Sequence, residues 1–127
     1  MLERRILLAE DEATTREILT YALRGEGYVV DAVVSAGAAT LCLESTPYAV
    51  VIADWLLPDG NGADVADAAA KLGAKTFIIS GYIRDLPDDA AARHELLTKR
   101  VGPTEIVAAV RQAIGSPVDE ARRSDPS

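Results

Sequence analysis

Short apolar runs alternate along this chain with longer segments in which apolar residues recur every three or four positions. An uninterrupted apolar run is typical of a strand that is buried on both faces, and the wider spacing is typical of a helix with one buried side. The alternation repeats five times. It predicts a parallel sheet with helices packed on both of its faces.

The predicted strands cover residues 6–9, 28–34, 48–53 and 76–79, with a short fifth strand anchored by Leu96 and Leu97. Crossovers between parallel strands are right-handed, and five strand-helix units of this length are commonly wound in the strand order 2-1-3-4-5. The expected fold class is therefore α/β, a flavodoxin-like (βα)5 doubly wound parallel sheet.

Capping residues place the helices between these strands. Thr14 and Glu17 form the pattern of a capping box, which predicts that a helix begins there. Ser35 is expected to cap a second helix, residues 63–72 to form a third, and Pro103 to open the last. The side chains expected to face the core are Ile18, Leu19, Ala22, Leu23, Ala36, Ala39, Leu43, Val65, Ala68, Ala69, Leu72, Ile106, Val107, Val110 and Ile114.

Two segments are less regular. Residues 83–93 permit only a short helix over residues 89–93, and we expect mobility there. Residues 116–127 are polar, contain two prolines and show no apolar period, which predicts a disordered C-terminal tail. The folded part is then a single domain of residues 1–115.

Composition narrows the classes of function. The 127 residues suit one domain, and 13 basic against 20 acidic residues give a formal charge of −7. That balance leaves no cationic surface for a nucleic-acid backbone or an anionic membrane. No apolar run approaches the roughly 20 residues that cross a bilayer, and the N-terminus lacks a signal-peptide core. We expect a cytoplasmic protein without direct nucleic-acid binding or membrane insertion.

The chain has one histidine, His94, and one cysteine, Cys42. These counts exclude an internal disulfide, a zinc site built from cysteines, and nearly all catalytic arrangements based on histidine. Cys42 lies between two leucines and is expected to be a small buried side chain, and His94 is expected at the surface or at the entry to a strand. Carboxylates must therefore carry the chemistry.

Polar side chains follow the ends of four predicted strands. Glu10 and Asp11 follow the first, Asp54 the third, Ser80 the fourth and Lys99 the fifth. In doubly wound sheets, ligands bind beyond the carboxyl ends of the strands, so these side chains should meet at one edge. Three carboxylates gathered there repel one another unless a cation intervenes, and Mg²⁺ prefers oxygen ligands. With the ion and a lysine nearby, one carboxylate could attack a phosphoryl group.

Together these residues resemble the CheY-like receiver domain of two-component response regulators over residues 4–115. The matching pieces are Glu10-Asp11 after a buried strand, Asp54 followed by Pro58 and Gly62, Ser80-Gly81, and Lys99. The resemblance implies phosphorylation of Asp54 by a histidine kinase or a histidine phosphotransfer protein. It also implies that Ser80 provides the switch hydroxyl and that Lys99 pairs with the phosphoryl group. The implied Mg²⁺ ligands are Asp11, Asp54 and the Leu56 carbonyl, with Glu10 acting through water.

The same resemblance implies a signalling domain rather than an enzyme, one that assists only its own phosphoryl transfer and dephosphorylation. No output domain follows residue 115, so a stand-alone receiver that signals through a downstream protein partner is expected, docking through the last strand and helix. Residues 77–82 are similar to a subgroup of such receivers with a Phe-Ala-Thr-Gly-x-Tyr motif. Leu96 and Arg100 replace the aromatic and the proline usual in the family, and Tyr82 is a candidate substitute for the aromatic.

Other interpretations stay open at this point. The chain could be an interaction module on the same fold that works without phosphorylation. A haloacid-dehalogenase-like phosphatase also uses an aspartyl-phosphate, but it needs a second acid where Leu56 stands. The acids at 10–12 could be a solvated loop or a helix cap, and Lys99 a surface charge. Trp55 is expected to pack or to face a partner rather than to take part in chemistry.

Overall fold

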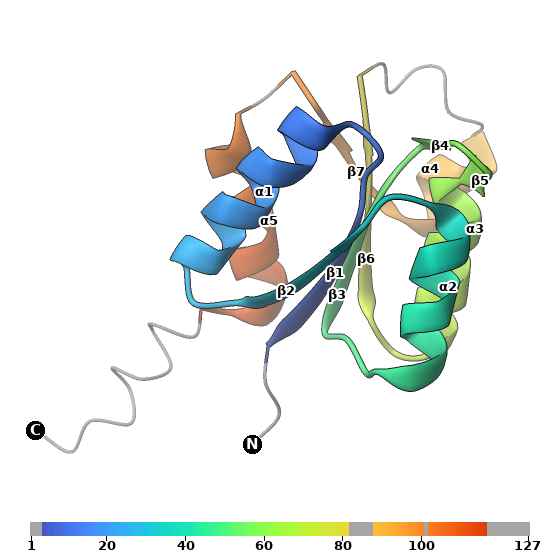
Figure 1. Ribbon diagram of the computed structural model, residues 1–127, viewed down its shortest axis with the longest axis horizontal. Coiled ribbons are helices and arrows are strands. Elements are labelled where there is room, and N and C mark those ends of the chain that lie inside the picture. The colour runs from blue at the N-terminus through green and yellow to red at the C-terminus, as the bar shows by residue number, and fades with distance from the viewer. Residues whose placement is uncertain (1–3, 82–87, 101, 117–127) are drawn as a thin grey trace, which may run out of the picture.

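The computed structural model describes residues 4–81, 88–100 and 102–116 as a layered α/β domain (Figure 1). Its five-stranded sheet is parallel, in the order β2-β1-β3-β6-β7. Counted along the chain, these five strands have the predicted order 2-1-3-4-5. The strands are β1 (Arg5–Ala9), β2 (Val29–Val33), β3 (Val50–Asp54), β6 (Lys75–Ser80) and β7 (Glu95–Thr98). The helices are α1 (Ala13–Gly25), α2 (Ala36–Ser45), α3 (Gly62–Lys71), α4 (Asp88–Arg93) and α5 (Pro103–Ile114).

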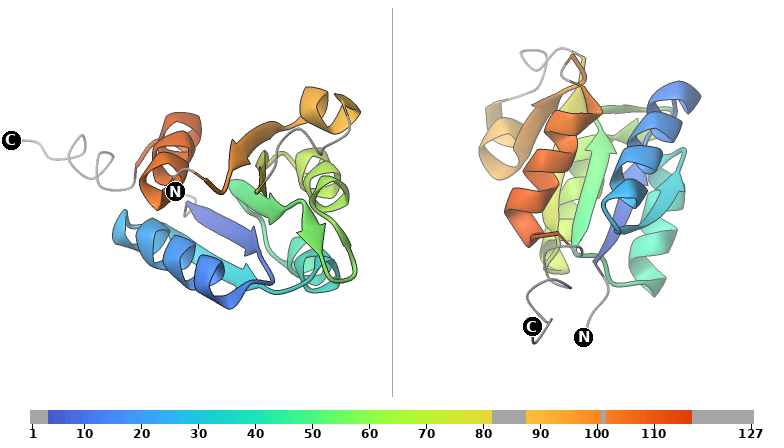
Figure 2. Two further views of the ribbon diagram at one scale, coloured as in Figure 1. Left: turned by 90° about the horizontal axis from the view of Figure 1, so that it is seen from above. Right: turned by 90° about the vertical axis from the view of Figure 1, so that its left-hand side faces the viewer.

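Helices lie on both faces of the sheet, as the two views of Figure 2 show, and an apolar cluster fills the space on each face. Helices α1 and α5 cover one face, where their apolar sides pack on alternate residues of the strands. Helices α2 and α3 cover the other face. Every residue of the central strand β3 is buried, as expected for a strand that is covered on both sides. The burial of this apolar surface is the main contribution to the stability that holds the strand ends in place.

The start of α1 differs from the prediction. Glu12, rather than Thr14, caps the helix, because its carboxylate accepts hydrogen bonds from the backbone N–H groups of Thr14 and Thr15. A carboxylate at this position also interacts favourably with the helix dipole. The capping-box interpretation was therefore wrong, and the helix-cap alternative for the 10–12 segment applies to Glu12.

Two side chains expected in the core lie at the surface instead. Ile18 is 48% exposed and Leu72 is 66% exposed. Each lies at the edge of the apolar face of its helix, where the helix surface curves away from the sheet. Leu72 also follows the last residue of α3. The other core predictions for these two helices are confirmed for Leu19, Leu23 and Val65.

The remaining caps agree with the prediction or add to it. Ser35 accepts a hydrogen bond from the Ala38 N–H and so caps α2, and Pro103 occupies the first turn of α5. Between β3 and α3, where a loop was expected, β4 (Leu56–Leu57) and β5 (Gly60–Asn61) form a short antiparallel pair.

His94 is buried, contrary to the expected surface position, although it does stand directly before β7. Its Nε2 lies 2.6 Å from Asp67 Oδ1, and its Nδ1 lies 2.7 Å from Thr76 Oγ1. A carboxylate can only accept, so Nε2 carries the proton. Arg93 donates to the same carboxylate, and together Arg93 and His94 lower the pKa of Asp67. The ring thus ties α3, β6 and the α4–β7 junction together.

Replacing His94 with alanine should lower the free energy of unfolding by about 2–4 kcal/mol, because it removes a buried ring, leaves the Thr76 hydroxyl without its His94 partner and takes one donor from the Asp67 carboxylate. The matched control is Arg93→Ala, which touches the same carboxylate from a side chain that is 43% exposed. That change should cost less than about 1 kcal/mol. Urea denaturation of both variants provides the comparison, and equal losses would contradict a special role of the buried ring.

The remaining sequence predictions have mixed outcomes. Cys42 is only half-buried, at the edge of the core under α2. Ser116, assigned to the tail, is buried. Residues 117–127, Tyr82 and residues 83–87 of the segment expected to be mobile lie outside the described residues. Within the described ranges, no helix is long and apolar enough to cross a bilayer.

Candidate functional site

Four strand ends meet at one edge of the sheet. The strand hydrogen bonding continues past the ends, because Glu10 N–H donates to the Val33 carbonyl and Lys99 N–H donates to the Ser80 carbonyl. Asp54 is the last residue of β3 and lies opposite Ile79 of β6. The backbone therefore fixes where each polar side chain of this edge begins.

Three carboxylates gather at this edge. One oxygen from each of Glu10, Asp11 and Asp54 can be chosen so that all lie within 4.8 Å of one another. Glu10 is fully buried and Asp54 is 6% exposed, whereas Asp11 is open to solvent. The cluster thus has a buried floor and one accessible side.

Lys99 lies within this cluster rather than at the surface. Its ammonium nitrogen lies 2.7 Å from Glu10 Oε1 and 2.7 Å from Asp54 Oδ2. Its side chain is only 25% exposed, so the two ion pairs are partly shielded from water. The interpretation of Lys99 as a plain surface charge is therefore wrong.

The electrostatics of the cluster follow from burial and crowding. Burial raises the pKa of Glu10 to about 7, with a further contribution from Asp54, although the Lys99 ammonium acts in the opposite direction. Burial acts to lower the pKa of Lys99, but its hydrogen bonds to Asp54 and Glu10 outweigh this effect and raise it. The carboxylates together therefore attract more positive charge than one lysine provides.

Backbone N–H groups orient the two buried carboxylates. Leu56 N–H donates to Asp54 Oδ1 at 3.2 Å, and Glu12 N–H donates to Glu10 Oε2 at 3.1 Å. Ser80 is buried at the end of β6, beside the same edge. The side chain of Leu56 is 71% exposed, and the role of its carbonyl stays a prediction.

Gly62 has a role that sequence reasoning missed. A Cβ atom added there would clash with the Asp54 carbonyl oxygen and would lie 2.9 Å from the Asp54 carbonyl carbon. Gly62 N–H also donates to the Trp55 carbonyl at 3.0 Å. The first residue of α3 therefore packs directly on the backbone of Asp54, a contact that only glycine allows. The available sequence signal was its spacing, eight residues after Asp54.

Asp59 also contributes more than its loop position indicated. Its carboxylate accepts hydrogen bonds from Ala36 N–H at 2.7 Å and Gly37 N–H at 2.9 Å, the first residues of α2. These bonds to a helix N-terminus lower the pKa of Asp59. They fasten the loop that follows Asp54 to a neighbouring helix.

Trp55 is half-buried and packs in a small apolar cluster with Leu96. Ala63 and Ala66 of α3 and Ile78 of β6 complete this cluster. The expected packing role of Trp55 is confirmed. Trp55, the residue directly after Asp54, thus shares an apolar cluster with Leu96 of β7.

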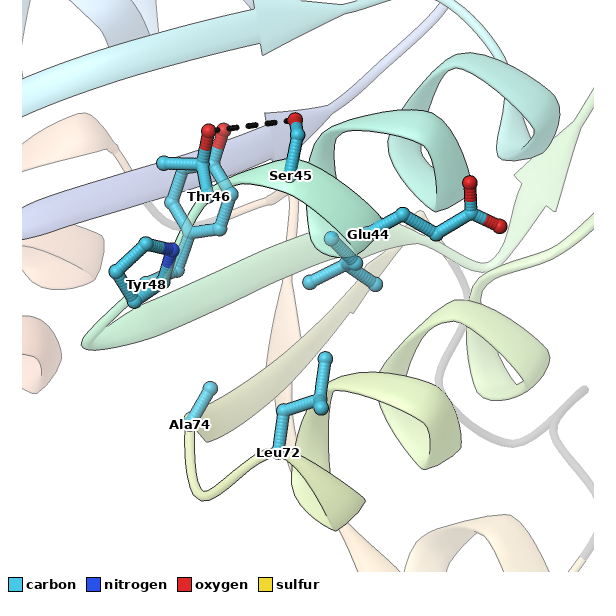
Figure 3. A pocket seen from close by; sticks show the side chains of 8 residues that line it. Glu44, Ser45, Thr46, Tyr48, Leu72 and Ala74 are labelled. Carbon is cyan, nitrogen blue, oxygen red and sulfur yellow. Dashed lines mark hydrogen bonds between the residues drawn. The ribbon is translucent and has the colours of Figure 1, made fainter.

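The pocket shown in Figure 3 lies elsewhere. It has a volume of about 290 Å³ and lies between the C-terminal ends of α2 and α3, with Glu44, Thr46, Tyr48 and Leu72 in its lining. It contains none of the three clustered carboxylates. The strand ends, rather than this pocket, are therefore the candidate site for the chemistry of this domain.

The donor set of the acidic edge fits a hard divalent cation. The three side chains offer only oxygen atoms, they are close enough to share one ion, and the open side next to Asp11 leaves room for water ligands. Mg²⁺ prefers such sites, with one or two carboxylates and several waters.

Comparison with known families decides the class of the protein. The sequence model of the response regulator receiver domain matches residues 6–111. The chain belongs to this family. Receiver domains are signalling domains of two-component systems, and the flavodoxin-like fold predicted from the sequence is that of CheY-like receivers.

Curated relatives of this receiver are of two lengths. An uncharacterised 14.6 kDa protein of Leptolyngbya boryana is 27% identical over 114 residues, which is 84% of this chain and 87% of the relative. The transcriptional regulatory protein PmrA of Pectobacterium parmentieri is 30% identical, over 87% of this chain and 52% of its own length. The DNA-binding response regulator MtrA of Mycobacterium tuberculosis is 31% identical, over 94% and 54%. This receiver thus spans about half the length of the two named regulators.

Solved receivers have the same fold. The response regulator TrrA of Thermotoga maritima, in complex with Mg²⁺-BeF, has a TM-score of 0.79 and 28% identity, over 87% of this chain and 99% of that one. The CheY-like receiver of Methanospirillum hungatei has a TM-score of 0.77 and 22% identity, over 98% and 100%. The likeness to the Methanospirillum hungatei receiver shows the fold, and the likeness to TrrA adds a relative whose structure contains Mg²⁺-BeF.

Proposed function

We propose that this receiver accepts a phosphoryl group on Asp54 with Mg²⁺ bound and signals through protein partners. The observation that carries the proposal is the setting of Asp54, whose buried carboxylate lies beside two further carboxylates and 2.7 Å from the Lys99 ammonium. A nucleophilic carboxylate needs positive charge around it before it can approach an anionic phosphoryl group. The cluster can provide this from one lysine and one bound cation.

The residues have distinct roles in the proposed transfer. Glu10, Asp11, Asp54 and the Leu56 carbonyl would hold Mg²⁺, Glu10 through water, and the ion would neutralise charge on the phosphoryl oxygens. An Asp54 oxygen attacks phosphorus as the bond between phosphorus and the donor's histidine nitrogen breaks, and the electron pair of that bond leaves with the nitrogen. Lys99 then pairs with a phosphoryl oxygen, and the Ser80 hydroxyl donates to another. Hydrolysis of the acyl phosphate, by water attack on phosphorus, restores Asp54.

We propose that partners dock on the last strand and helix, and a groove lies beside that helix. It has a volume of about 270 Å³, lies between α1 and α5, and includes Lys99, Arg100, Pro103 and the half-exposed Ile18. A histidine kinase or a histidine phosphotransfer protein docked here would reach the acidic edge from its open side. The downstream protein partner would read the same face after phosphorylation, in the cytoplasm.

The experiment is incubation with Mg²⁺ and acetyl phosphate, followed by intact mass measurement. The wild type should gain one phosphoryl group, and Asp54→Asn should gain none. The matched control is Asp64→Asn, because Asp64 is an exposed aspartate of α3 and its loss should leave the reaction unchanged. No gain in the wild type would favour the phosphorylation-independent module, and rapid multiple turnover of phosphate esters would favour the phosphatase.

Mg²⁺ alone should raise the melting temperature of the wild type, because the ion binds the folded carboxylate cluster and not the unfolded chain. The Asp11→Ala variant should lose most of this increase, since it removes the exposed ligand without disturbing the buried floor. Differential scanning calorimetry with Mg²⁺ and with a chelator measures the effect. An equal increase in the variant would place the ion elsewhere.

A further inference from the structure

The loop between β1 and α1 is held from the helix side by one arginine. Arg16 is half-buried in the first turns of α1, and its guanidinium folds back over the loop. Its Nη1 atom lies 3.0 Å from the Glu10 carbonyl oxygen and 3.3 Å from the Asp11 carbonyl oxygen. One cationic group therefore binds the backbone of two of the three acids that precede the helix, Glu10 and Asp11.

The two acids depend on this hold to different degrees. Glu10 is also fixed by the sheet, through its N–H bond to Val33, and by the Glu12 N–H on its carboxylate. Asp11 is exposed, so packing cannot fix the direction of its side chain. Where the Asp11 carboxylate lies is then set mainly by its backbone, which Arg16 holds at the carbonyl.

We propose that Arg16 is a positioning residue of this receiver, which aims the Asp11 carboxylate at the shared cation by fixing the backbone of the acidic loop. This inference rests on the proposed function, because it assumes that Asp11 is a ligand of Mg²⁺. Groups that orient metal ligands are often worth ten- to a hundredfold in metal affinity. Arg16 reaches this loop through the Glu10 and Asp11 carbonyl oxygens.

A purely electrostatic role and a positioning role predict opposite effects of removing Arg16 on Mg²⁺ binding. The guanidinium is a fixed positive charge near a cation site, so by Coulomb repulsion alone its removal should tighten Mg²⁺ binding. If Arg16 acts by position, its removal should loosen binding instead. The sign of the change therefore separates the two explanations.

The test is Mg²⁺ titration by isothermal calorimetry at fixed ionic strength. Arg16→Ala should raise the Mg²⁺ dissociation constant about tenfold. Arg16→Lys keeps the charge on a stem one atom shorter, and it should raise the constant by a smaller factor. Arg24→Ala is the matched control, because Arg24 stands about 12 Å further along α1 and donates to the Val30 carbonyl. It removes the same charge and should leave the constant unchanged.

The outcomes are distinguishable. Tighter or unchanged binding in Arg16→Ala, with normal binding in the wild type, would overturn the positioning role and leave the proposed function intact. No Mg²⁺ binding in the wild type would sink the proposed function itself. Melting temperatures measured in a chelator identify any variant that is merely unfolded. For such a variant, Arg16→Lys decides, since binding equal to the wild type would again overturn the role.

Discussion

Replacing Gly62 with alanine should abolish most phosphorylation of Asp54 and lower the free energy of unfolding by about 1–3 kcal/mol. The added methyl group has no space, because it would clash with the Asp54 carbonyl oxygen and press on the Ala53 carbonyl, 3.1 Å away. Either α3 or the end of β3 must then shift, and both carry the loop that orients Asp54. Initial rates with acetyl phosphate and urea denaturation measure the two effects.

The control for this prediction is Gly25→Ala. A Cβ at Gly25 would meet no atom within 4 Å, and Gly25 is the last residue of α1, away from the acidic edge. The change should be neutral or stabilise by less than about 1 kcal/mol. Normal phosphorylation of Gly62→Ala would show that the tight contact does not control the position of Asp54.

Replacing Lys99 with methionine should destabilise the metal-free protein by about 2–4 kcal/mol at pH near 8. The change leaves Glu10 and Asp54 without the ammonium that now lies 2.7 Å from each. Mg²⁺ should stabilise the variant more than the wild type, because the ion then meets uncompensated carboxylates. Thermal unfolding with Mg²⁺ and with a chelator gives both quantities.

The loss of stability caused by replacing Lys99 with methionine should become smaller as the pH falls. The pKa of Glu10, raised to about 7 by burial, lies above its ordinary value of 4.5. A carboxyl with a raised pKa contributes most stability when protonated, below the ordinary value, and loses that contribution as the pH rises through about 7. Without Lys99 the protonated form is favoured further, so the penalty is smaller at pH near 5 than at pH near 8. In a Glu10→Gln background this pH dependence should vanish, and a penalty independent of pH in the native background would contradict the coupling.

The strand order and the acidic edge could be predicted because both depend on simple patterns. A strand buried on both faces must be apolar throughout, as β3 is, and the polar residue that follows it must lie at the sheet edge. Asp54 and Lys99 were therefore placed correctly without any knowledge of side-chain contacts. The strand order and the position of the acidic edge both follow from the burial of hydrophobic residues.

What the sequence did not reveal depends on contacts between distant segments. Thr14 is the better N-cap by residue type, but the Glu12 carboxylate reaches the Thr14 and Thr15 N–H groups and caps the helix instead. His94 reads as polar, but partners 18 and 27 residues away satisfy it and permit its burial. Gly62 stands out in the sequence only by its spacing from Asp54, and its contact with the Asp54 backbone is visible only in the folded chain.

The bonds from Asp59 to α2 make two amide protons into reporters of the phosphorylation loop. Ala36 N–H and Gly37 N–H are bonded to a carboxylate 23 and 22 residues further along the chain. Their exchange with deuterated solvent requires the hydrogen bonds to the exposed Asp59 carboxylate to break. Deuterium uptake at the start of α2 therefore measures how often this contact between Asp59 and α2 is lost, without a probe being placed in the site itself.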